Sequence, residues 1–326
     1  MSSLKNLNIV QVKSSSAMID WHMGNTCQNA CSYCDPCLHI GDATNPTLDQ
    51  MKKLVIAAEE KFQFTDGTRS IKFAFSGGEP TINTNFGSFV QWLKERGHRI
   101  TVITNGGRTL RWWKEWGHYL DFVIFSYHTE FTDIEHFYEI VEYQSSLEKG
   151  VAVHLIAWPA LFEKIVSARQ RLLTIPNCSI IVKKIIDDWV PAGVTMEPYT
   201  PEQLTWINDN FSKGSTSNPF NDKLYVYTDT QQRIRPHGQE IRHYGKNKFY
   251  GWNCRQGFKN LSINAYGDIY AAHCRQLKLG HLSDVENLAW PKTESVCKFI
   301  SCHCATDYVI DKSAPNIKSQ ASSKEI

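Results

Sequence analysis

Between residues 17 and 185, short runs rich in β-branched and aromatic residues alternate with segments whose apolar positions recur at helical spacing. This alternation is typical of βα units built on a parallel sheet. The strands that it predicts are Ala17–Met23, Ile71–Phe75, Ile100–Thr104, Phe122–Ser126, Val151–Ala157 and Ser179–Ile185. The helices are expected to open near Thr47, Asn85, Leu110, Asp133, Pro159 and Thr200. Thr47 precedes Gln50 at capping-box spacing, which supports the first of these starts.

The number of βα units limits the architecture of this α/β fold. Six units are too few to close an ordinary eight-stranded barrel. The alternatives are an open doubly wound sheet and a partial, splayed barrel, and the hydrophobic pattern does not separate them.

A second module is expected after Phe211, because the polar segment Lys213–Pro219 ends the βα rhythm. Within it, Asn260–Ile263 and Asp268–Ala271 flank Ala265–Tyr266–Gly267, a pattern typical of a β-hairpin with glycine in the turn. We therefore divide the chain into a core (residues 1–211), a small β-rich module (212–310) and a disordered tail (311–326).

Charge and hydropathy exclude several classes of partner. The chain has 35 basic and 33 acidic residues, a formal charge of +2, which is too small a field to indicate a nucleic-acid partner. Residues Met1–Lys13 lack the apolar run of a signal peptide, and no stretch approaches the length of a membrane span. A cytoplasmic location without a membrane partner is expected.

The ten cysteines change this picture, because in a cytosolic protein clustered cysteines more often bind metal than form disulfides. Cys27, Cys31 and Cys34 share one loop after the first predicted strand, at the edge where parallel α/β sheets place their sites. A four-iron cluster ordinarily takes four thiolates, so these three would leave one iron open to an exchangeable ligand. The alternative is a zinc site that includes Cys37, which we otherwise interpret as a small buried thiol.

The motif Cys27-x3-Cys31-x-Tyr33-Cys34, followed by Gly77–Gly78–Glu79 at the end of the second strand, resembles the signature of the radical S-adenosylmethionine (radical SAM) superfamily. The resemblance implies a partial (β/α)6 TIM-like barrel in which a [4Fe–4S] cluster binds S-adenosylmethionine. One electron then cleaves the sulfonium to methionine and a 5′-deoxyadenosyl radical, which abstracts a hydrogen from the substrate. The positions implied to hold the cofactor, with Glu79 on its amino group, are Tyr33, Gly77, Gly78, Glu79, Thr104, Asn105 and Ser126. His128 is either a satisfied strand-end histidine or a substrate contact.

A second group of cysteines lies near the C-terminus: Cys254, Cys274, Cys297, Cys302 and Cys304. The first two bracket the predicted hairpin, and a four-cysteine site would suit a second [4Fe–4S] cluster or a structural zinc. The run Cys254-x2-Gly257, Asn264-x2-Gly267-Asp268 and Cys274 resembles the SPASM and twitch auxiliary-cluster modules of radical SAM enzymes, and the single-cluster twitch type fits the length. Since Cys302 and Cys304 are so close in sequence, we expect both to bind. Cys297 is then either a competitor for the fourth position or a bystander, and the pattern does not decide which four of the five bind.

Two functions follow as hypotheses. The first is a radical SAM oxidoreductase or transferase, supplied with electrons by a flavodoxin- or ferredoxin-type donor, that modifies a peptide or a small metabolite. The second is a zinc-stabilised barrel that binds protein or RNA. The near-neutral charge and the intact Gly77–Gly78–Glu79 argue against the second.

Overall fold

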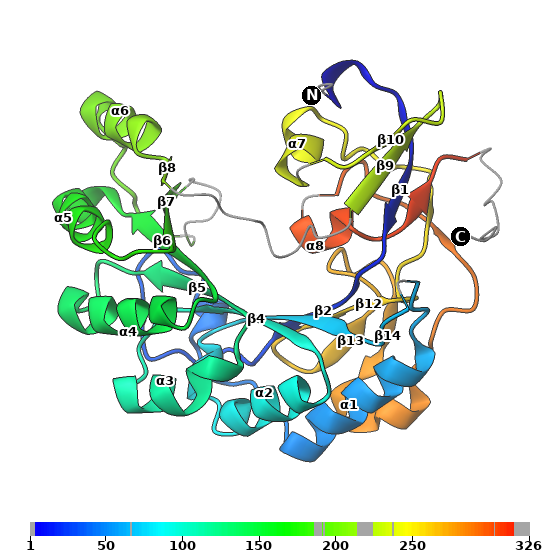
Figure 1. Cartoon of the computed structure of the whole chain (residues 1–326), viewed down its shortest axis with the longest axis horizontal. Helices are drawn as coiled ribbons and strands as arrows, with labels where there is room; N and C mark the ends of the chain where they lie inside the picture. The colour runs from blue at the N-terminus through cyan, green and yellow to red at the C-terminus, as the bar shows by residue number, and fades with distance from the viewer. Residues whose placement is uncertain are drawn as a thin grey trace.

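The computed structural model describes residues 4–65, 67–185, 191, 193–213, 224–236, 238–302 and 304–315. Its strands form two sheets. The larger has the order β14-β13-β12-β2-β3-β4-β5-β6-β7-β8, and the smaller has the order β10-β9-β1-β16-β11-β15. Figure 1 shows the larger sheet curving beneath the smaller one.

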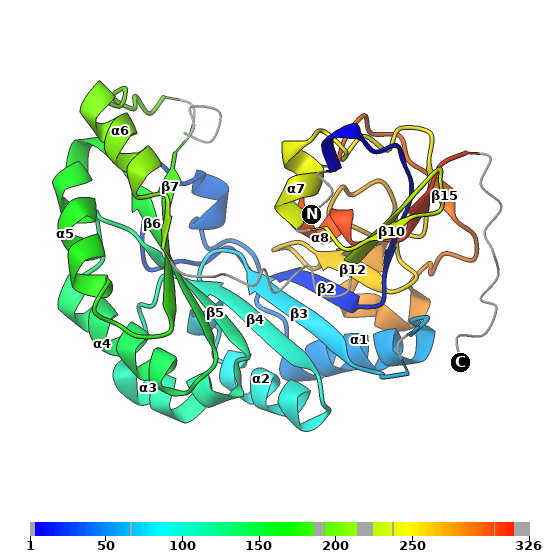
Figure 2. The ribbon, with the colours of Figure 1, turned by 45° about the horizontal axis from the view of Figure 1, so that its top comes forward.

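The parallel part of the larger sheet confirms the predicted βα units. Its strands are β2 (Ala17–His22), β3 (Ile71–Ser76), β4 (Arg99–Thr104), β5 (Phe122–Tyr127), β6 (Gly150–Ala157) and β7 (Cys178–Lys184). The short β8 (Ser212–Lys213) adds antiparallel to β7. Because β8 and β14 end the sheet without pairing to each other, the barrel stays open, as Figure 2 shows. The fold is therefore the α/β partial barrel.

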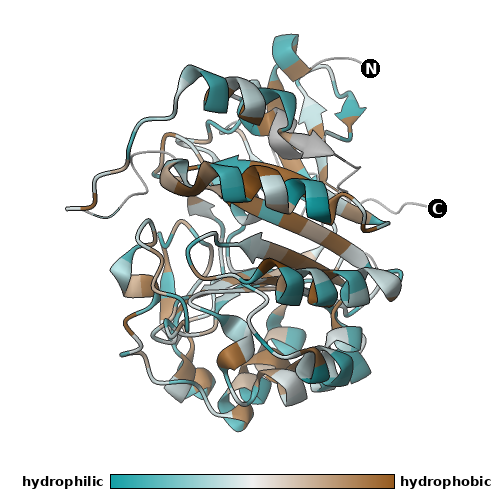
Figure 3. Ribbon diagram, turned by 90° about the vertical axis from the view of Figure 1, so that its left-hand side faces the viewer, coloured by the Kyte–Doolittle hydropathy of each residue, from teal (hydrophilic) through white to brown (hydrophobic). Residues whose placement is uncertain are grey.

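The long helices cover the convex face of this sheet (Figures 1 and 3). They are α1 (Leu48–Lys61), α2 (Phe86–Glu95), α3 (Leu110–Trp116), α4 (Ile134–Ser146), α5 (Phe162–Leu172) and α6 (Pro201–Asp209). Thr47 and Thr200 form capping boxes with Gln50 and Gln203, so two of the predicted starts are fixed by side-chain to backbone hydrogen bonds. Single 3₁₀ turns occur at Leu4–Asn6, Pro36–Leu38, Pro80–Ile82, Gly117–Tyr119 and Pro159–Leu161, and a longer 3₁₀ segment at Leu282–Asn287.

Alternation along the strands sorts apolar and polar side chains onto opposite faces of the sheet. In β2, Ile19 and Trp21 belong to the main apolar core under the helices, while Asp20 hydrogen-bonds to His273 on the other side. The concave face therefore carries polar side chains, and it is the face over which the smaller sheet lies (Figure 2).

The smaller sheet joins the two ends of the chain. Its strands are β1 (Ile9–Ser14), β9 (Leu224–Thr228), β10 (Arg233–Ile234), β11 (Asn253–Cys254), β15 (Ser295–Val296) and β16 (Lys312–Ser313). β1 pairs with β9 and with β16, whereas the sequence division assigned residues 9–14 to the core and 312–313 to the tail. Both segments are instead strands of this sheet. Residues 316–326 of the predicted tail, and most of the predicted Lys213–Pro219 linker, lie outside the described residues.

The predicted hairpin is present, and it connects the two parts of the molecule. β12 (Asn260–Ile263) and β13 (Asp268–Tyr270) are antiparallel, with Gly267 in the turn at a φ of +89°, and β14 (Lys278–His281) follows. β12 pairs in parallel with β2, so this hairpin extends the barrel sheet. Two short helices, α7 (Gly238–His243) and α8 (Ala305–Tyr308), lie beside the smaller sheet. In the described part of the chain, no helix combines the length and apolarity needed to cross a bilayer.

Candidate functional site

The loop that follows β2 places Cys27, Cys31 and Cys34 around one cavity, at the carboxyl ends of the parallel strands. Three predicted strand-end segments line the same cavity: Gly77–Glu79 after β3, Thr104–Asn105 at the end of β4, and Ser126 in β5. His128 also lines it. The structure therefore brings together the cysteines and all but one of the predicted cofactor-binding residues.

The exception is Tyr33, which is not among the residues that line this cavity. Its ring is buried, 5.1 Å from the ring of Trp158, and its hydroxyl is 2.9 Å from His128 Nδ1. Burial lowers the pKa of His128 to about 4, so this imidazole is neutral near pH 7. Tyr33 therefore supports the loop through packing. His128 has a hydrogen-bond partner in Tyr33 and also lines the cavity, so it meets the description of a satisfied histidine while remaining placed to contact a substrate.

Hydrogen bonds from later strands hold the cysteine loop in place. The backbone N–H and hydroxyl of Ser32 donate to the two carboxylate oxygens of Glu130, at 2.8 and 2.6 Å. Asn105 Nδ2 donates to Cys27 Sγ at 3.5 Å, and Gln28 Nε2 donates to Asn105 Oδ1 at 2.8 Å. Since both anchors come from strand ends on the same edge, the loop is fixed on two sides.

The two glycines of Gly77–Gly78–Glu79 make room for this loop. A Cβ atom on Gly78 would collide with the carbonyl oxygen of Thr26, and one on Gly77, whose φ is +130°, would lie 2.7 Å from Gly24 O. The N–H groups of Gly78 and Glu79 donate to Gly24 O and Thr26 O, at 3.1 and 2.8 Å. The two glycines thus allow the backbone after β3 to approach the cysteine loop closely.

Glu79 is only 1% exposed and is held by four hydrogen bonds. Its Oε1 accepts from the backbone and hydroxyl of Thr81 and from the Thr104 hydroxyl, at 3.0, 2.7 and 2.8 Å. Its Oε2 accepts from the N–H of Asn105 at 2.7 Å and keeps room for one more donor. Burial raises the pKa of Glu79, while the bonds from Thr81, Asn105 and Thr104 oppose that shift. The carboxylate is a preorganised acceptor in the cavity wall.

The three thiols fit a metal centre. Burial raises the pKa of Cys31 to about 12 and that of Cys34 to about 11, so without a cation these thiols keep their protons. Neither they nor Cys27 form a disulfide. Cys37 is exposed and is not in the cavity lining, so the interpretation of it as a small buried thiol is wrong. Three ligands without the fourth suit a cubane with an open iron position.

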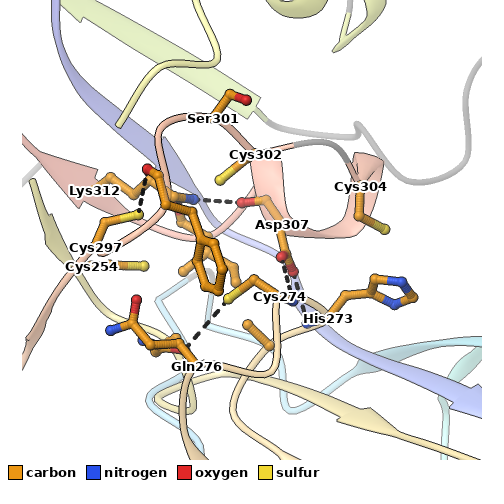
Figure 4. Close-up of a pocket in the computed structure, with 14 residues that line it drawn as sticks. Cys254, His273, Cys274, Gln276, Cys297, Ser301, Cys302, Cys304, Asp307 and Lys312 are labelled. Atoms are coloured by element: carbon orange, nitrogen blue, oxygen red, sulfur yellow. Dashed lines mark hydrogen bonds between the residues drawn. The ribbon is translucent and has the colours of Figure 1, made fainter. Parts of the chain in front are cut away.

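All five C-terminal cysteines line a second cavity, under the smaller sheet (Figure 4). Burial raises the pKa of Cys274 and of Cys302 to about 12, and in both cases the neighbouring Cys254 and Cys297 add to the shift. Cys254 and Cys297 are therefore neighbours of both Cys274 and Cys302. All four thiols line one cavity and none forms a disulfide, as a four-thiolate metal site requires.

Cys304 stands apart from these four. Its Sγ lies 2.9 Å from the Thr306 hydroxyl, and the groups that shift its pKa include Asp20 and Asp307 but no other cysteine. In Figure 4 its sulfur lies on the His273 side of Asp307. The arrangement therefore places Cys297, and not Cys304, beside the other three thiols, whereas sequence spacing had favoured Cys304 as a ligand together with Cys302.

Two buried acids that the sequence analysis missed organise this region. Asp307 accepts hydrogen bonds from the backbone N–H groups of His273 and Cys274, at 2.9 and 2.8 Å, and so fixes the position of Cys274. Asp20 in β2 lies 2.8 Å from His273 Nδ1, and this hydrogen bond raises the pKa of His273 against the effect of burial. An acidic residue inside the mostly apolar Ala17–Met23 segment was the available signal for Asp20.

An open α/β barrel with three cysteines on the loop after its first parallel strand defines the class of this protein. Residues 21–149, which contain that loop and Gly77–Gly78–Glu79, match the family model described as Radical SAM superfamily. The chain therefore carries a domain of the radical SAM superfamily. The cofactors that this family implies are a [4Fe–4S] cluster and S-adenosylmethionine, and the three-thiol cavity fits them.

Solved structures with the same fold include SuiB from Streptococcus suis, at 13% identity and a TM-score of 0.52, over 86% of this chain and 66% of that one. They also include native anSMEcpe with bound AdoMet, at 13% identity and a TM-score of 0.51, over 82% of this chain and 78% of that one. At such identities the likeness shows the fold alone. This chain spans just under two thirds of the length of SuiB. No curated protein matches the sequence.

Proposed function

We propose that the protein is an enzyme that reductively cleaves S-adenosylmethionine and abstracts a hydrogen atom from its substrate. The observation that carries this proposal is the cavity shared by Cys27, Cys31 and Cys34 with Glu79 in its wall. When bound at these thiols, a [4Fe–4S] cluster supplies the electron that cleaves the sulfonium to methionine and a 5′-deoxyadenosyl radical.

The residues of the chain bind and orient the cofactor around that electron transfer. Glu79 accepts the ammonium group of S-adenosylmethionine at its remaining lone pair, because a buried carboxylate forms a strong charge-assisted hydrogen bond. Thr104 and Asn105 hold that carboxylate from the end of β4. Ser126 contributes a hydroxyl from β5, and neutral His128 faces the same cavity.

For the second cavity we propose an auxiliary [4Fe–4S] cluster on Cys254, Cys274, Cys297 and Cys302, in the manner of a twitch module. Four protein thiolates leave no position for substrate on the metal, so this centre would serve as an acceptor for the electron of a substrate radical. A structural zinc on the same four thiols is the alternative, and metal analysis separates the two. A flavodoxin- or ferredoxin-type protein is the proposed electron donor to the first cluster.

The proposed substrate class is a peptide. One structure with this fold is SuiB bound to the precursor peptide SuiA, at 13% identity and a TM-score of 0.52. Another is native anSMEcpe with AdoMet and a Cp18Cys peptide, at 14% identity and a TM-score of 0.51. These two structures support a peptide over a small metabolite as the first substrate to test.

The proposed activity predicts that S-adenosylmethionine is cleaved even without the physiological substrate. Anaerobically reconstituted protein, given S-adenosylmethionine and dithionite, should release 5′-deoxyadenosine and methionine in equal amounts, measured by liquid chromatography. Omitting dithionite should stop the release, because cleavage needs one electron. Failure to form 5′-deoxyadenosine in a protein that has bound iron would contradict the proposal.

Cys297 and Cys304, to which the proposal gives opposite roles, provide a direct test of the second centre. Cys297→Ser should lose the auxiliary metal, because its thiol neighbours three others in the cavity. Cys304→Ser should retain it, because its sulfur lies toward Asp20 and Thr306 instead. Iron content per chain measures both. Retention in Cys297→Ser together with loss in Cys304→Ser would restore the assignment made from sequence spacing.

A further inference from the structure

A lysine occupies the wall of the four-thiol cavity. Lys312 lies in β16, directly opposite Cys254 of β11 in an antiparallel ladder. Residues opposite each other in such a ladder project to the same face of the sheet, with Cβ atoms roughly 5 Å apart. Lys312 and Cys254 both line the cavity that also holds Cys274, Cys297 and Cys302, as Figure 4 shows.

The ammonium of Lys312 is buried without an ion pair. The residue is 3% exposed, and its Nζ donates to the carbonyl oxygens of Asp307 and Ile310 and lies 5.1 Å from the centre of the Phe249 ring. Lys259, a similarly buried lysine at 4% exposure, has Asp311 Oδ2 at 2.9 Å from its Nζ. Within the described residues, no carboxylate oxygen takes the corresponding place beside Lys312.

A buried cation needs a compensating negative charge, because desolvation of an isolated ammonium is expensive. Asp307 also lines this cavity and its charge attracts that of Lys312, but the two form no ion pair, and the Asp307 carboxylate accepts hydrogen bonds from the backbone N–H groups of His273 and Cys274. The four thiols in the same wall are a second and larger source of negative charge. They become thiolates only when a metal displaces their protons.

We propose that Lys312 is the charge partner of the metal centre on Cys254, Cys274, Cys297 and Cys302, and that its ammonium raises the reduction potential of that centre. This inference rests on the auxiliary [4Fe–4S] cluster of the proposed function. The inference goes beyond that function by assigning a role to a residue that is not a ligand: Lys312 makes the centre a better electron acceptor.

The direction of the effect follows from charge. Four thiolates on a [4Fe–4S]²⁺ core carry a net charge of about −2, and uptake of one electron makes it about −3. A cation at the edge of the cavity is attracted more strongly to the reduced form, so it favours reduction. In the reaction, the electron would come from the substrate radical, which is thereby oxidised. Removing the ammonium should make that transfer less favourable.

The experiment isolates the second centre. In the full-length chain with Cys27, Cys31 and Cys34 replaced by alanine, only the auxiliary cluster should remain, and its midpoint potential can be measured by anaerobic redox titration followed by electron paramagnetic resonance. Lys312→Met should shift the potential to a more negative value. Lys312→Arg should keep it near that of the parent, because the charge is retained. Lys259→Met, which removes a buried cation outside this cavity lining, should leave it unchanged.

An unchanged potential in Lys312→Met would overturn the inference, as would an equal shift in Lys259→Met. If Lys312→Met binds no iron while Lys312→Arg and Lys259→Met do, the cation is needed for the cluster to assemble, which supports charge partnership. If Lys312→Arg also binds no iron while Lys259→Met does, the inference of charge partnership would be overturned, and Lys312 would act through packing. A parent protein without iron, or with zinc in its place, would instead refute the auxiliary cluster itself, before any lysine variant is compared.

Discussion

Replacing Cys27, Cys31 and Cys34 together by alanine should abolish cleavage of S-adenosylmethionine and remove about half of the iron from the anaerobically purified protein. These thiols are the cysteines that line the first cavity. Two [4Fe–4S] clusters hold about eight irons, so about four should remain on the second cavity. Iron analysis and the assay for 5′-deoxyadenosine measure the two effects on the same sample.

A cysteine outside both cavities provides the matched control. Cys178 begins β7 and lines neither the first cavity nor the second, so Cys178→Ser should keep the full iron content and the activity. If the triple alanine variant kept all of its iron, the first cavity would not be a cluster site. Zinc as the main metal of the wild-type protein would contradict both clusters at once.

Glu79→Gln should weaken binding of S-adenosylmethionine by roughly 1.5–3 kcal/mol, the typical contribution of a hydrogen bond to a charged group. This corresponds to a loss of affinity of roughly tenfold to somewhat over a hundredfold, measurable by calorimetry on the anaerobic, iron-loaded protein. The variant should also unfold at a lower Tm. The amide that replaces one carboxylate oxygen brings N–H groups toward donors such as the N–H of Asn105 or the Thr104 hydroxyl.

Thr81→Ala separates the two effects of the Glu79 substitution. It removes one hydroxyl bond to Glu79 Oε1, of 2.7 Å, but keeps the carboxylate and its negative charge. The variant should therefore lose stability while binding S-adenosylmethionine nearly as well as the wild type. An equally large loss of affinity in Thr81→Ala would mean that Glu79 acts by holding the ends of β3 and β4 together, without touching the cofactor.

Local sequence patterns were sufficient for the barrel but not for the smaller sheet. Each parallel strand from β2 to β7 is a short apolar run, and polar caps such as Thr47 and Thr200 mark the helices that follow. All six strands were therefore predicted to within a residue or two. β1 carries a weaker, half-polar pattern, and its partners at 224–228 and 312–313 lie far along the chain. Nothing within residues 9–14 indicates those partners.

The same distinction applies to the sites. Cys27, Cys31 and Cys34 share one loop, so their spacing alone indicated a shared metal. The proposed C-terminal ligand set depends on tertiary structure. Cys254 is held by β11, the backbone of Cys274 by its bond to Asp307, and Cys297 lies beside thiols that are distant in sequence. Closeness in sequence is a weaker guide for Cys302 and Cys304, because Cys304 is the N-cap of α8 and its sulfur lies beside Thr306, whereas Cys302 lies near Cys254 and Cys297. Lys312 lay in a segment that appeared to be tail.

The position of β1 between β9 and β16 also bears on how the protein can be made. A chain cut after residue 211 would keep β2 to β7, yet β1 would have lost both of its partners and β2 would have become an exposed edge strand. During synthesis, the loop with Cys27 can meet the ends of β3 and β4 long before residue 312 leaves the ribosome. Pairing between residues so distant in sequence comes late, since the intervening chain must first be ordered. Iron supplied to a growing chain would thus find Cys27, Cys31 and Cys34 gathered before the four thiols proposed for the second centre.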